Sequence, residues 1–375
     1  MIKSRSGKDR MKSRINNVLI AFLVISVLLC SSCNKTRTTG DVAVVSQTNI
    51  DASLDRESIP ADSAIAFKDL KTPAHVEKSF DQNNISVNIN ADVSVPEIES
   101  LYRFVFVFDE ENMNRIVNEW LLPAFPDAKS ITDESFDYGW GTSKVDGNVL
   151  MSFKADRDGN IGFIDAAKDI NGFEEDHHFE SRYITSKIPL GMNTDAKEAE
   201  KTAKAFVEKY SPFKYSAYKI TDINDKQRNK GYYEIYLQPE YRKIPVCVAL
   251  SCEGYSTALF FEVCISADGV FAFQGRSNLK ETDCKPIESI MPFDSIMDYF
   301  SNDIAVLAIG TDVRVNNIYL AYIPESDNSA SPEIKLTPAW CFEYTDSRVE
   351  DGQEIINNFT LAYSVENGRV IGQFF

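Results

Sequence analysis

Basic residues are scarce in this chain of 375 residues: 39 Lys and Arg accompany 56 Asp and Glu, for a formal net charge of −17 at pH 7. Residues 1–32 carry six bases and one acid, so the remainder of the chain carries a formal charge of −22. A nucleic-acid-binding protein needs a basic patch that neutralises phosphates, and the sequence contains no such cluster. The composition therefore argues against nucleic acid as a partner.

Common catalytic motifs are also lacking. The chain contains no Gly-x-Ser-x-Gly nucleophile elbow, no His-Glu-x-x-His motif and no Gly-rich phosphate loop. We therefore predict no catalytic residue and no cofactor, and expect that the protein is not an enzyme. An enzyme of unfamiliar type stays open, because an acidic chain offers many carboxylates and their separation in space decides whether two of them act as a catalytic pair.

Histidine is rare, with three in the whole chain, and two of these are adjacent, His177 and His178, in the acidic segment 174–180. Adjacent side chains point to opposite faces of a strand or lie about 100° apart on a helix, so the pair is a poor chelator of a metal ion. The third histidine, His75, is distant in sequence. We interpret the segment as an exposed acidic loop and predict no metal site.

One other acidic loop has part of the pattern of a calcium loop. Asp156, Asp158, Gly159 and Asp165 match positions 3, 5, 6 and 12 of an EF-hand loop, but Lys154 stands at position 1, where an acidic ligand is required. The flanking residues have the pattern of strands rather than helices. Because a similar Gly-containing turn recurs at two other places, a hairpin turn is favoured over a calcium site.

Cysteine spacing does not fit the common zinc sites. Beyond residue 33 no Cys-x2-Cys pair occurs among the five cysteines, Cys247, Cys252, Cys264, Cys284 and Cys341. Because five is odd, at most two disulfides close among them, and the sequence leaves the pairing open. We expect buried thiols, with or without one disulfide, since a free Cys packs as a small hydrophobe.

The N-terminus has the pattern of an export signal. A basic segment precedes an uncharged run, whose strongly apolar core, Val18–Cys30, is shorter than the roughly 20 residues of a membrane span. The end of the run, Ser31-Ser32-Cys33, resembles the lipobox of bacterial lipoproteins, although Cys30 stands where Leu is usual. This resemblance implies a signal peptide of residues 1–32 and a lipid anchor, with palmitate, on Cys33.

Two expectations follow from this leader. A diacylglycerol on Cys33 supplies more than one acyl chain, which stable anchoring requires. Residues 33–72 are rich in Thr, Ser, Asp and Ala and are predicted to form a flexible tether. We therefore expect the protein on the outer face of the cell membrane, held there by lipid. The true start of the chain, Met1 or Met11, is left open.

From residue 73 the pattern becomes that of a folded body. Apolar residues at helical spacing predict helices over 110–122 and 195–210 and from 293 to 300. Apolar runs predict strands over 85–93, 101–108, 232–237, 245–250, 313–323 and 333–344. Asp158-Gly159, Asp268-Gly269 and Asn367-Gly368 each separate two such runs and predict a hairpin turn, because these residues adopt positive φ readily.

The order of these elements predicts the fold class. A helix followed by antiparallel strands occurs twice, at an interval of about 100 residues. We therefore predict an α+β fold of antiparallel sheets with packed helices, built from duplicated helix-plus-hairpin modules. The predicted modules are residues 73–190, 191–284 and 285–375.

Two stretches resemble known families. The segment 85–108, with Ile89-Asn90-Ala91-Asp92-Val93-Ser94-Val95-Pro96, resembles a family of uncharacterised lipoproteins of Gram-positive Bacillota, chiefly clostridia, which has no assigned activity. The run Leu336–Tyr344 with the Asn367-Gly368 turn is similar to the last strands of PepSY-like modules, which occur in sensor-kinase regulators of the YycH and YycI type. That likeness implies a PepSY-like or cystatin-like fold and the binding or restraint of a partner.

Several aromatic residues are candidates for lining a groove for peptide or sugar: Tyr138, Trp140, Tyr232, Tyr233, Tyr236 and Tyr241. Aromatic side chains in strands also pack in protein cores, and half of the predicted strand 232–237 must face inward if that strand packs. Core packing is the favoured interpretation.

Together these features predict a lipid-anchored surface protein of a Gram-positive bacterium. We expect it to bind or regulate a surface partner, a protein or peptide, through sheet edges or a concave sheet face. A hydrolase acting on a cell-surface polymer is the alternative, and a deep pocket with two carboxylates would favour it. A solute-binding protein is a third, although the chain lacks the long βαβ alternation of two-lobed binding proteins.

Overall fold

The computed structural model describes residues 64–116, 140–145, 148–155, 160–165, 184–225, 229–247, 259–276, 278–325, 333–350 and 352–374. Side chains are described for these residues except 140–165, 225, 373 and 374. The leader, Cys33, most of the tether, His177, His178 and Cys252 lie outside the described residues. What was predicted for them stays a prediction.

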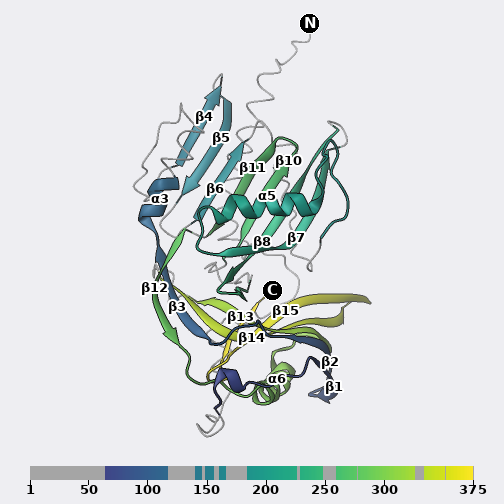
Figure 1. Cartoon of the computed structure of the whole chain (residues 1–375). Coiled ribbons are helices and arrows are strands. Elements are labelled where there is room, and N and C mark those ends of the chain that lie inside the picture. The colour runs from purple at the N-terminus through teal and green to yellow at the C-terminus, as the bar shows by residue number, and fades with distance from the viewer. Residues whose placement is uncertain are drawn as a thin grey trace. The chain divides into compact units, whose positions relative to one another are not determined.

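The predicted fold class is wrong, because the described part of the chain is predominantly β (Figure 1). Its strands form two large sheets, and three α-helices accompany them: α3 (Glu110–Ile116), α5 (Ala196–Glu208) and α6 (Phe293–Leu307). The prediction of purely antiparallel sheets also fails, since β2 (Ile85–Ser94) and β13 (Asp312–Glu325) run parallel. The physical reason is that strands from distant parts of the chain pair in the same sheet, so the hairpins do not build separate repeated modules.

Contacts divide the folded body into two compact units, each made of segments that are separated in sequence. The first unit lies within residues 107–239 and 259–280, and the second lies within residues 64–106, 240–258 and 281–375. The module boundaries predicted from the sequence, after residues 72, 190 and 284, stay a prediction.

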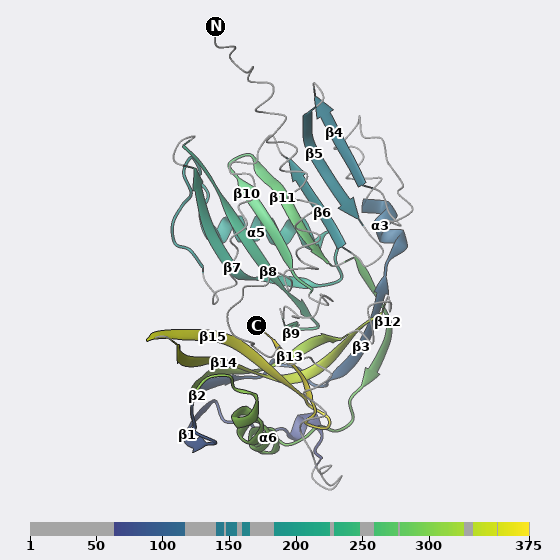
Figure 2. The same cartoon turned by 180° about the vertical axis from the view of Figure 1, so that it is seen from behind.

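The sheet of the first unit contains strands from both of its segments. Its order is β4 (Trp140–Val145), β5 (Asn148–Ala155), β6 (Asn160–Asp165), β11 (Gly269–Arg276), β10 (Phe261–Ser266), β8 (Lys230–Tyr241) and β7 (Lys214–Asp225). The short strand β9 (Ile244–Pro245) pairs with the end of β8. Helix α5 lies across one face of this sheet (Figure 1), and Figure 2 shows the opposite face.

Helix α5 confirms the helix predicted over 195–210. Asp195 caps its N-terminus, because the carboxylate accepts a hydrogen bond from the Glu198 N–H at 2.9 Å. Ala199, Ala203 and Val207 follow one another at helical spacing and are buried. The apolar stripe therefore holds α5 against the sheet.

The three predicted hairpins are all present as pairs of antiparallel strands. β5 pairs with β6 up to Ala155 opposite Ile161, and β10 pairs with β11 up to Ser266 opposite Gly269. In the third hairpin, β15 (Gln353–Ser364) pairs with β16 (Val370–Phe374). Gly269 and Gly368 take φ values of 98° and 64°, which a side chain with Cβ adopts rarely. The turn chemistry that predicted these hairpins is confirmed for both glycines.

The second unit contains a mixed sheet of order β1 (His75–Gln82), β2, β13, β14 (Ile334–Glu350), β15 and β16. Two further strands extend it: β3 (Tyr102–Phe108) pairs with β14 and with β12 (Leu279–Pro286). Near the start of the described chain lies a single 3₁₀ turn, Phe67–Asp69. The strand positions predicted over 85–93, 101–108, 313–323 and 333–344 are confirmed as β2, β3, β13 and β14.

Helix α6 packs against one face of this sheet through aromatic side chains. The Phe293 ring lies 4.8 Å from the Trp340 ring, and the Phe300 ring stacks on Phe342 at 4.3 Å between centroids. Next to these rings, the Tyr363 hydroxyl donates a hydrogen bond to the buried Asp303 carboxylate at 3.1 Å. This face is the core of the second unit.

The opposite face of the same sheet is partly covered. At one end an apolar cluster of Tyr319, Ala321, Ile323, Ala339, Cys341, Ala362 and Ile371 packs with Cys247. The backbone N–H of Cys247 donates to the Tyr322 carbonyl at 2.8 Å, so residues 244–247 continue beside β13 where β2 has ended. The other end of this face is solvent-exposed and polar.

The described cysteines are free thiols: Cys247, Cys264 and Cys341 are buried, and Cys284 is partly exposed. The expectation of buried thiols therefore holds for three of them. Within the described residues, none of the helices has the length and apolar character that crossing a membrane requires.

Candidate binding face

The exposed end of the sheet in the second unit presents side chains in three rows across five strands. Because residues directly opposite in a ladder point to the same face, the registers define each row. The central row is Ser79, Asn88, Arg314, Thr345 and Asn358. One neighbouring row is Asp81, Ser86, Asp312, Ser347 and Ile356. On the other side Glu77 lies opposite Asn90, next to the inserted Asn316, and the next complete row is His75, Asp92, Asn317, Glu343 and Thr360. We call this surface the open face.

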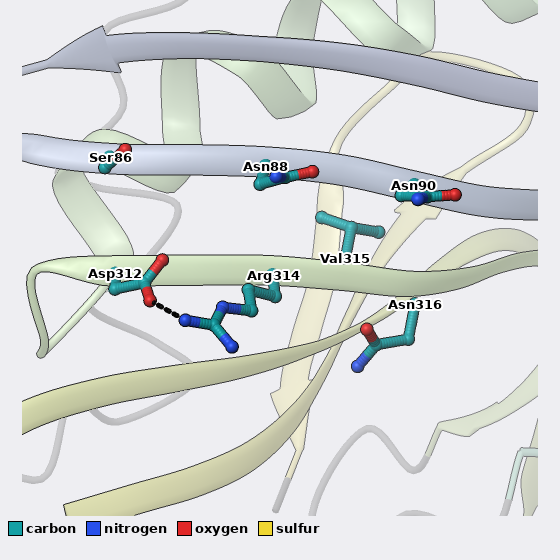
Figure 3. Close-up of a pocket in the computed structure, with 7 residues that line it drawn as sticks. All are labelled: Ser86, Asn88, Asn90, Asp312, Arg314, Val315 and Asn316. Atoms are coloured by element: carbon teal, nitrogen blue, oxygen red, sulfur yellow. Dashed lines mark hydrogen bonds and ion pairs between the residues drawn. The ribbon is translucent and has the colours of Figure 1, made fainter. Parts of the chain in front are cut away.

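A groove of about 560 Å³ lies on the open face between β2 and β13 (Figure 3). Its lining consists of Ser86, Asn88, Asn90, Asp312, Arg314, Val315 and Asn316. Figure 3 shows the three β2 residues following one another along the strand, as period-two alternation requires. Their alternating neighbours Val87, Ile89 and Ala91 are buried on the α6 side. The polar lining is therefore fixed by the alternation of a half-buried strand.

An ion pair lies inside this groove. The Arg314 Nη2 donates to the Asp312 Oδ2 at 2.5 Å, and this hydrogen bond raises the pKa of Arg314 above its usual value. Arg314 remains exposed, with 64% of its side-chain surface accessible. A guanidinium has five N–H donors, so the pair leaves donors of Arg314 directed to the groove.

A β-bulge in β13 shapes one end of the groove. The register shifts between Val315 and Asn317, which inserts Asn316 as an extra residue on the exposed side. Asn317 then donates a hydrogen bond through Nδ2 to the Glu343 carboxylate on β14 at 3.1 Å. This bond marks the boundary between the open face and the covered apolar cluster that begins at Tyr319.

The opposite end of the open face has an apolar rim. Val349 on β14 and Ile356 on β15 are 73% and 56% exposed. Both belong to the alternation that carries Ser347 and Asn358, so they face the same side as the groove. Two exposed aliphatic side chains thus flank a polar surface.

A second polar cluster lies on the sheet of the first unit, on the face opposite α5. Glu234 and Tyr236 on β8 lie beside Glu262 on β10, and all three are buried. Glu262 accepts a hydrogen bond from the Gln274 amide at 2.7 Å. Burial raises the pKa of Glu234 to about 7, against the opposing effect of the nearby Lys219 ammonium.

The aromatic candidates from the sequence do not form a groove among the described residues. Tyr232, Tyr233 and Tyr236 are buried, and Tyr233 donates through its hydroxyl to the backbone carbonyls of Lys187 and Thr194. Core packing, the favoured interpretation, is therefore correct for these three. Tyr138 lies outside the described residues, and only the backbone of Trp140 is described.

The fold is similar to that of a solved structure. A solved structure of an uncharacterised protein from Eubacterium rectale matches with a TM-score of 0.52 at 15% sequence identity, covering 86% of this chain and 97% of that one. No family model matches the chain, and the search of curated proteins finds no relative. The likeness shows the fold alone. It agrees with the resemblance to uncharacterised Bacillota proteins, and it carries no activity to this chain.

Sequence reasoning missed the open face. The alternation over 85–93 correctly separated Ser86, Asn88 and Asn90 from their buried neighbours. It gave no sign that β13 lies beside β2, which places Arg314 next to Asn88. The predicted lipidation site, Cys33, lies outside the described residues, so its lipidation stays a prediction.

Proposed function

We propose that this protein is a lipid-anchored, extracytoplasmic binding protein that holds a cell-surface partner on the open face. The observation that carries the proposal is the groove between β2 and β13, in which amide and hydroxyl side chains surround one guanidinium on an exposed sheet. These groups bind through directional hydrogen bonds, and the residues that line the groove include no histidine or lysine to activate the Ser86 hydroxyl and no second carboxylate to pair with Asp312.

The chemistry of the groove favours binding over hydrolysis. Its lining contains one carboxylate, Asp312, and that carboxylate pairs with Arg314. Hydrolysis of a glycosidic bond commonly uses two carboxyl groups on opposite sides of the scissile bond. A surface built from neutral hydrogen-bonding groups on a rigid sheet is preorganised, so little ordering cost opposes binding.

The anchor in this proposal rests on the sequence of the leader. Ser31-Ser32-Cys33 at the end of an apolar run supports lipidation of Cys33, and a tether over 33–72 would carry the folded body away from the bilayer. Cys33→Ala is expected to release the protein from membranes or to leave it unprocessed. A Cys33→Ala protein that stays anchored and incorporates radiolabelled palmitate would remove the basis for the anchor.

Photo-crosslinking tests the binding face directly. A benzophenone amino acid is introduced at position 356, an exposed position at the rim of the open face, and, as a matched control, at position 302, an exposed asparagine of α6 on the other side of the sheet. The expected result on intact membranes is an adduct at position 356 that is absent at 302. No adduct at 356, or equal adducts at both positions, would contradict the proposal.

A hydrolase of a surface polymer is the second candidate, and one observation favours it. Glu234 and Glu262 lie on neighbouring strands on one face of the first unit, and a pKa of about 7 for Glu234 suits a general acid. Both side chains are buried, with 2% and 4% of their surface exposed, which hinders the approach of a polymer. Release of reducing sugar from cell-wall glycan that is lost in Glu234→Gln and Glu262→Gln would favour hydrolysis.

A further inference from the structure

The centre of the open face offers side chains to a ligand, because the backbone of its three inner strands is already hydrogen-bonded, whereas β1 and residues 353–359 of β15 lie at sheet edges. β2, β13 and β14 each have a paired strand on both sides, so their N–H and C=O groups belong to the sheet ladders. An extended peptide that binds by strand addition needs unpaired main-chain groups at a sheet edge. What remains for a ligand on this face is an array of amides, hydroxyls and one guanidinium.

The composition of this array is mainly neutral. Its uncharged polar members are Ser79, Ser86, Asn88, Asn90, Asn316, Asn317, Thr345, Ser347, Asn358 and Thr360. Glu77, Asp81, Asp92, Asp312, Glu343 and Glu354 contribute carboxylates, and Arg314 contributes the cation at the centre. Polyanions are disfavoured, because six negative charges oppose one positive charge. Asparagine and serine both donate and accept, which matches a ligand whose hydroxyls also do both.

The dimensions of the array suit a chain molecule. Neighbouring strands lie about 4.8 Å apart, so the five strands of a row span about 19 Å from Ser79 to Asn358. Arg314 lies in the middle of this row, and the groove beside it forms a depression at the centre of the surface. A ligand that crosses the strands therefore meets hydrogen-bonding groups along its length, with the guanidinium near its midpoint.

From these observations we propose that the open face binds an uncharged, hydroxyl-rich polysaccharide of the cell surface, laid across β1, β2, β13, β14 and β15. This inference rests on the proposed function and specifies its ligand. Asn88 and Asn90 donate to and accept from ring hydroxyls on one side of the groove. Arg314, oriented by Asp312, donates two N–H groups to adjacent hydroxyls of one sugar.

The test uses the full-length protein in detergent and four immobilised polysaccharides. Chitin, an insoluble β-glucan and a mannan are the uncharged matrices, and polygalacturonate is the acidic one. The expected result is retention on at least one uncharged matrix, reversed by its soluble oligosaccharide, and no retention on polygalacturonate. No retention on any uncharged matrix, or stronger retention on polygalacturonate, would overturn the inference.

Two variants test whether the open face is responsible for retention of the protein on a polysaccharide matrix. Asn88→Ala and Arg314→Ala remove exposed side chains, and each is expected to weaken binding to the retaining matrix at least tenfold. Asn302→Ala, on α6, is the matched control and is expected to bind as the unmodified protein does. Unchanged retention in both open-face variants would also overturn the inference. Circular dichroism melting curves that coincide with that of the unmodified protein establish that the variants are folded.

The outcome also separates this inference from the proposed function. If the benzophenone at position 356 crosslinks to a protein while the uncharged matrices fail to retain the chain, the glycan assignment is wrong and the binding face stands. If no adduct forms at position 356 and no matrix retains the protein, both fail together.

Discussion

Arg242 and Glu281 are joined by two hydrogen bonds, with the Arg242 Nη2 3.2 Å from Oε1 and 3.1 Å from Oε2 of the carboxylate. The same guanidinium lies 4.6 Å from the centroid of the Phe104 ring and 5.7 Å from that of Tyr241. Tyr241 in turn donates a hydrogen bond to Glu281, and burial together with this bond raises the pKa of Tyr241 to about 12. One cation thus links β12, β3 and the turn after β8.

Replacing Arg242 by Lys is expected to destabilise the second unit by about 1 kcal/mol, although the charge is kept. A lysine ammonium lacks the planar fork that bonds the carboxylate while stacking on an aromatic ring. Arg103→Lys is the control, because Arg103 is similarly exposed and pairs with the Glu366 carboxylate but contacts no aromatic ring within the described residues. Urea unfolding curves measure both, and an equal effect of the two substitutions would contradict a special role for Arg242.

Lys243→Gly is expected to stabilise the protein by about 0.5 kcal/mol. Arg242 and Lys243 occupy the two-residue turn between Tyr241 and Ile244 with φ values of 48° and 69°. Such a turn costs non-glycine residues about 1 kcal/mol or more each, and the greater freedom of glycine in the unfolded chain offsets part of the gain. Lys243→Ala keeps the Cβ and should give no gain in melting temperature; a gain equal to that of glycine would rule out backbone strain.

Gly368→Ala is expected to cost about 3 kcal/mol or more of unfolding free energy. Gly368 has a φ of 64°, and a Cβ there would lie 2.3 Å from Cε2 of Tyr299 and 2.9 Å from the Met291 Sδ. Gly352, with a φ of 78° and open space around it, is the matched control. Gly352→Ala should cost only the backbone term, about 1 kcal/mol. Similar melting temperatures for the two variants would show that Tyr299 moves aside freely.

Glu234 is expected to make the stability of the protein fall as pH rises from about 4.5 to about 7. Its pKa in the folded state is raised to about 7, so the folded chain holds a proton that the unfolded chain has released. The stabilisation is complete below the unfolded value and is lost as pH passes the folded one. At about 1.4 kcal/mol per pH unit, the loss is on the order of 3 kcal/mol.

Glu234→Gln tests this pH dependence, because glutamine resembles the protonated acid. The variant should match the unmodified protein at pH 4.5 and exceed its urea midpoint at pH 8. Glu111→Gln on α3 changes an exposed carboxylate and serves as the control. A pH profile of the Glu234→Gln variant that parallels that of the unmodified protein would exclude Glu234 as the titrating group.

Local elements of the fold were predictable, because their signals lie within a few residues. Asp195 and the apolar stripe of α5 identified that helix, and Gly269 and Gly368 identified two hairpins. The fold class was wrong because it depended on which strands pair. Nothing near Ser86 in the sequence indicates that its neighbour in the sheet is Asp312. Parallel strands are not joined by a tight turn, so no turn motif in the sequence predicts their pairing.

The sequence by itself determined the acidity of the body and the alternation that turns Asn88 outward, and it carries the pattern from which an export leader and an anchor on Cys33 are predicted. These follow from composition and local pattern. The tertiary structure alone decided that Arg314 lies beside Asn88, that Asp312 orients it, and that Tyr236 is core rather than groove. Long-range pairing creates the open face, because a sheet brings together side chains that chain order keeps apart.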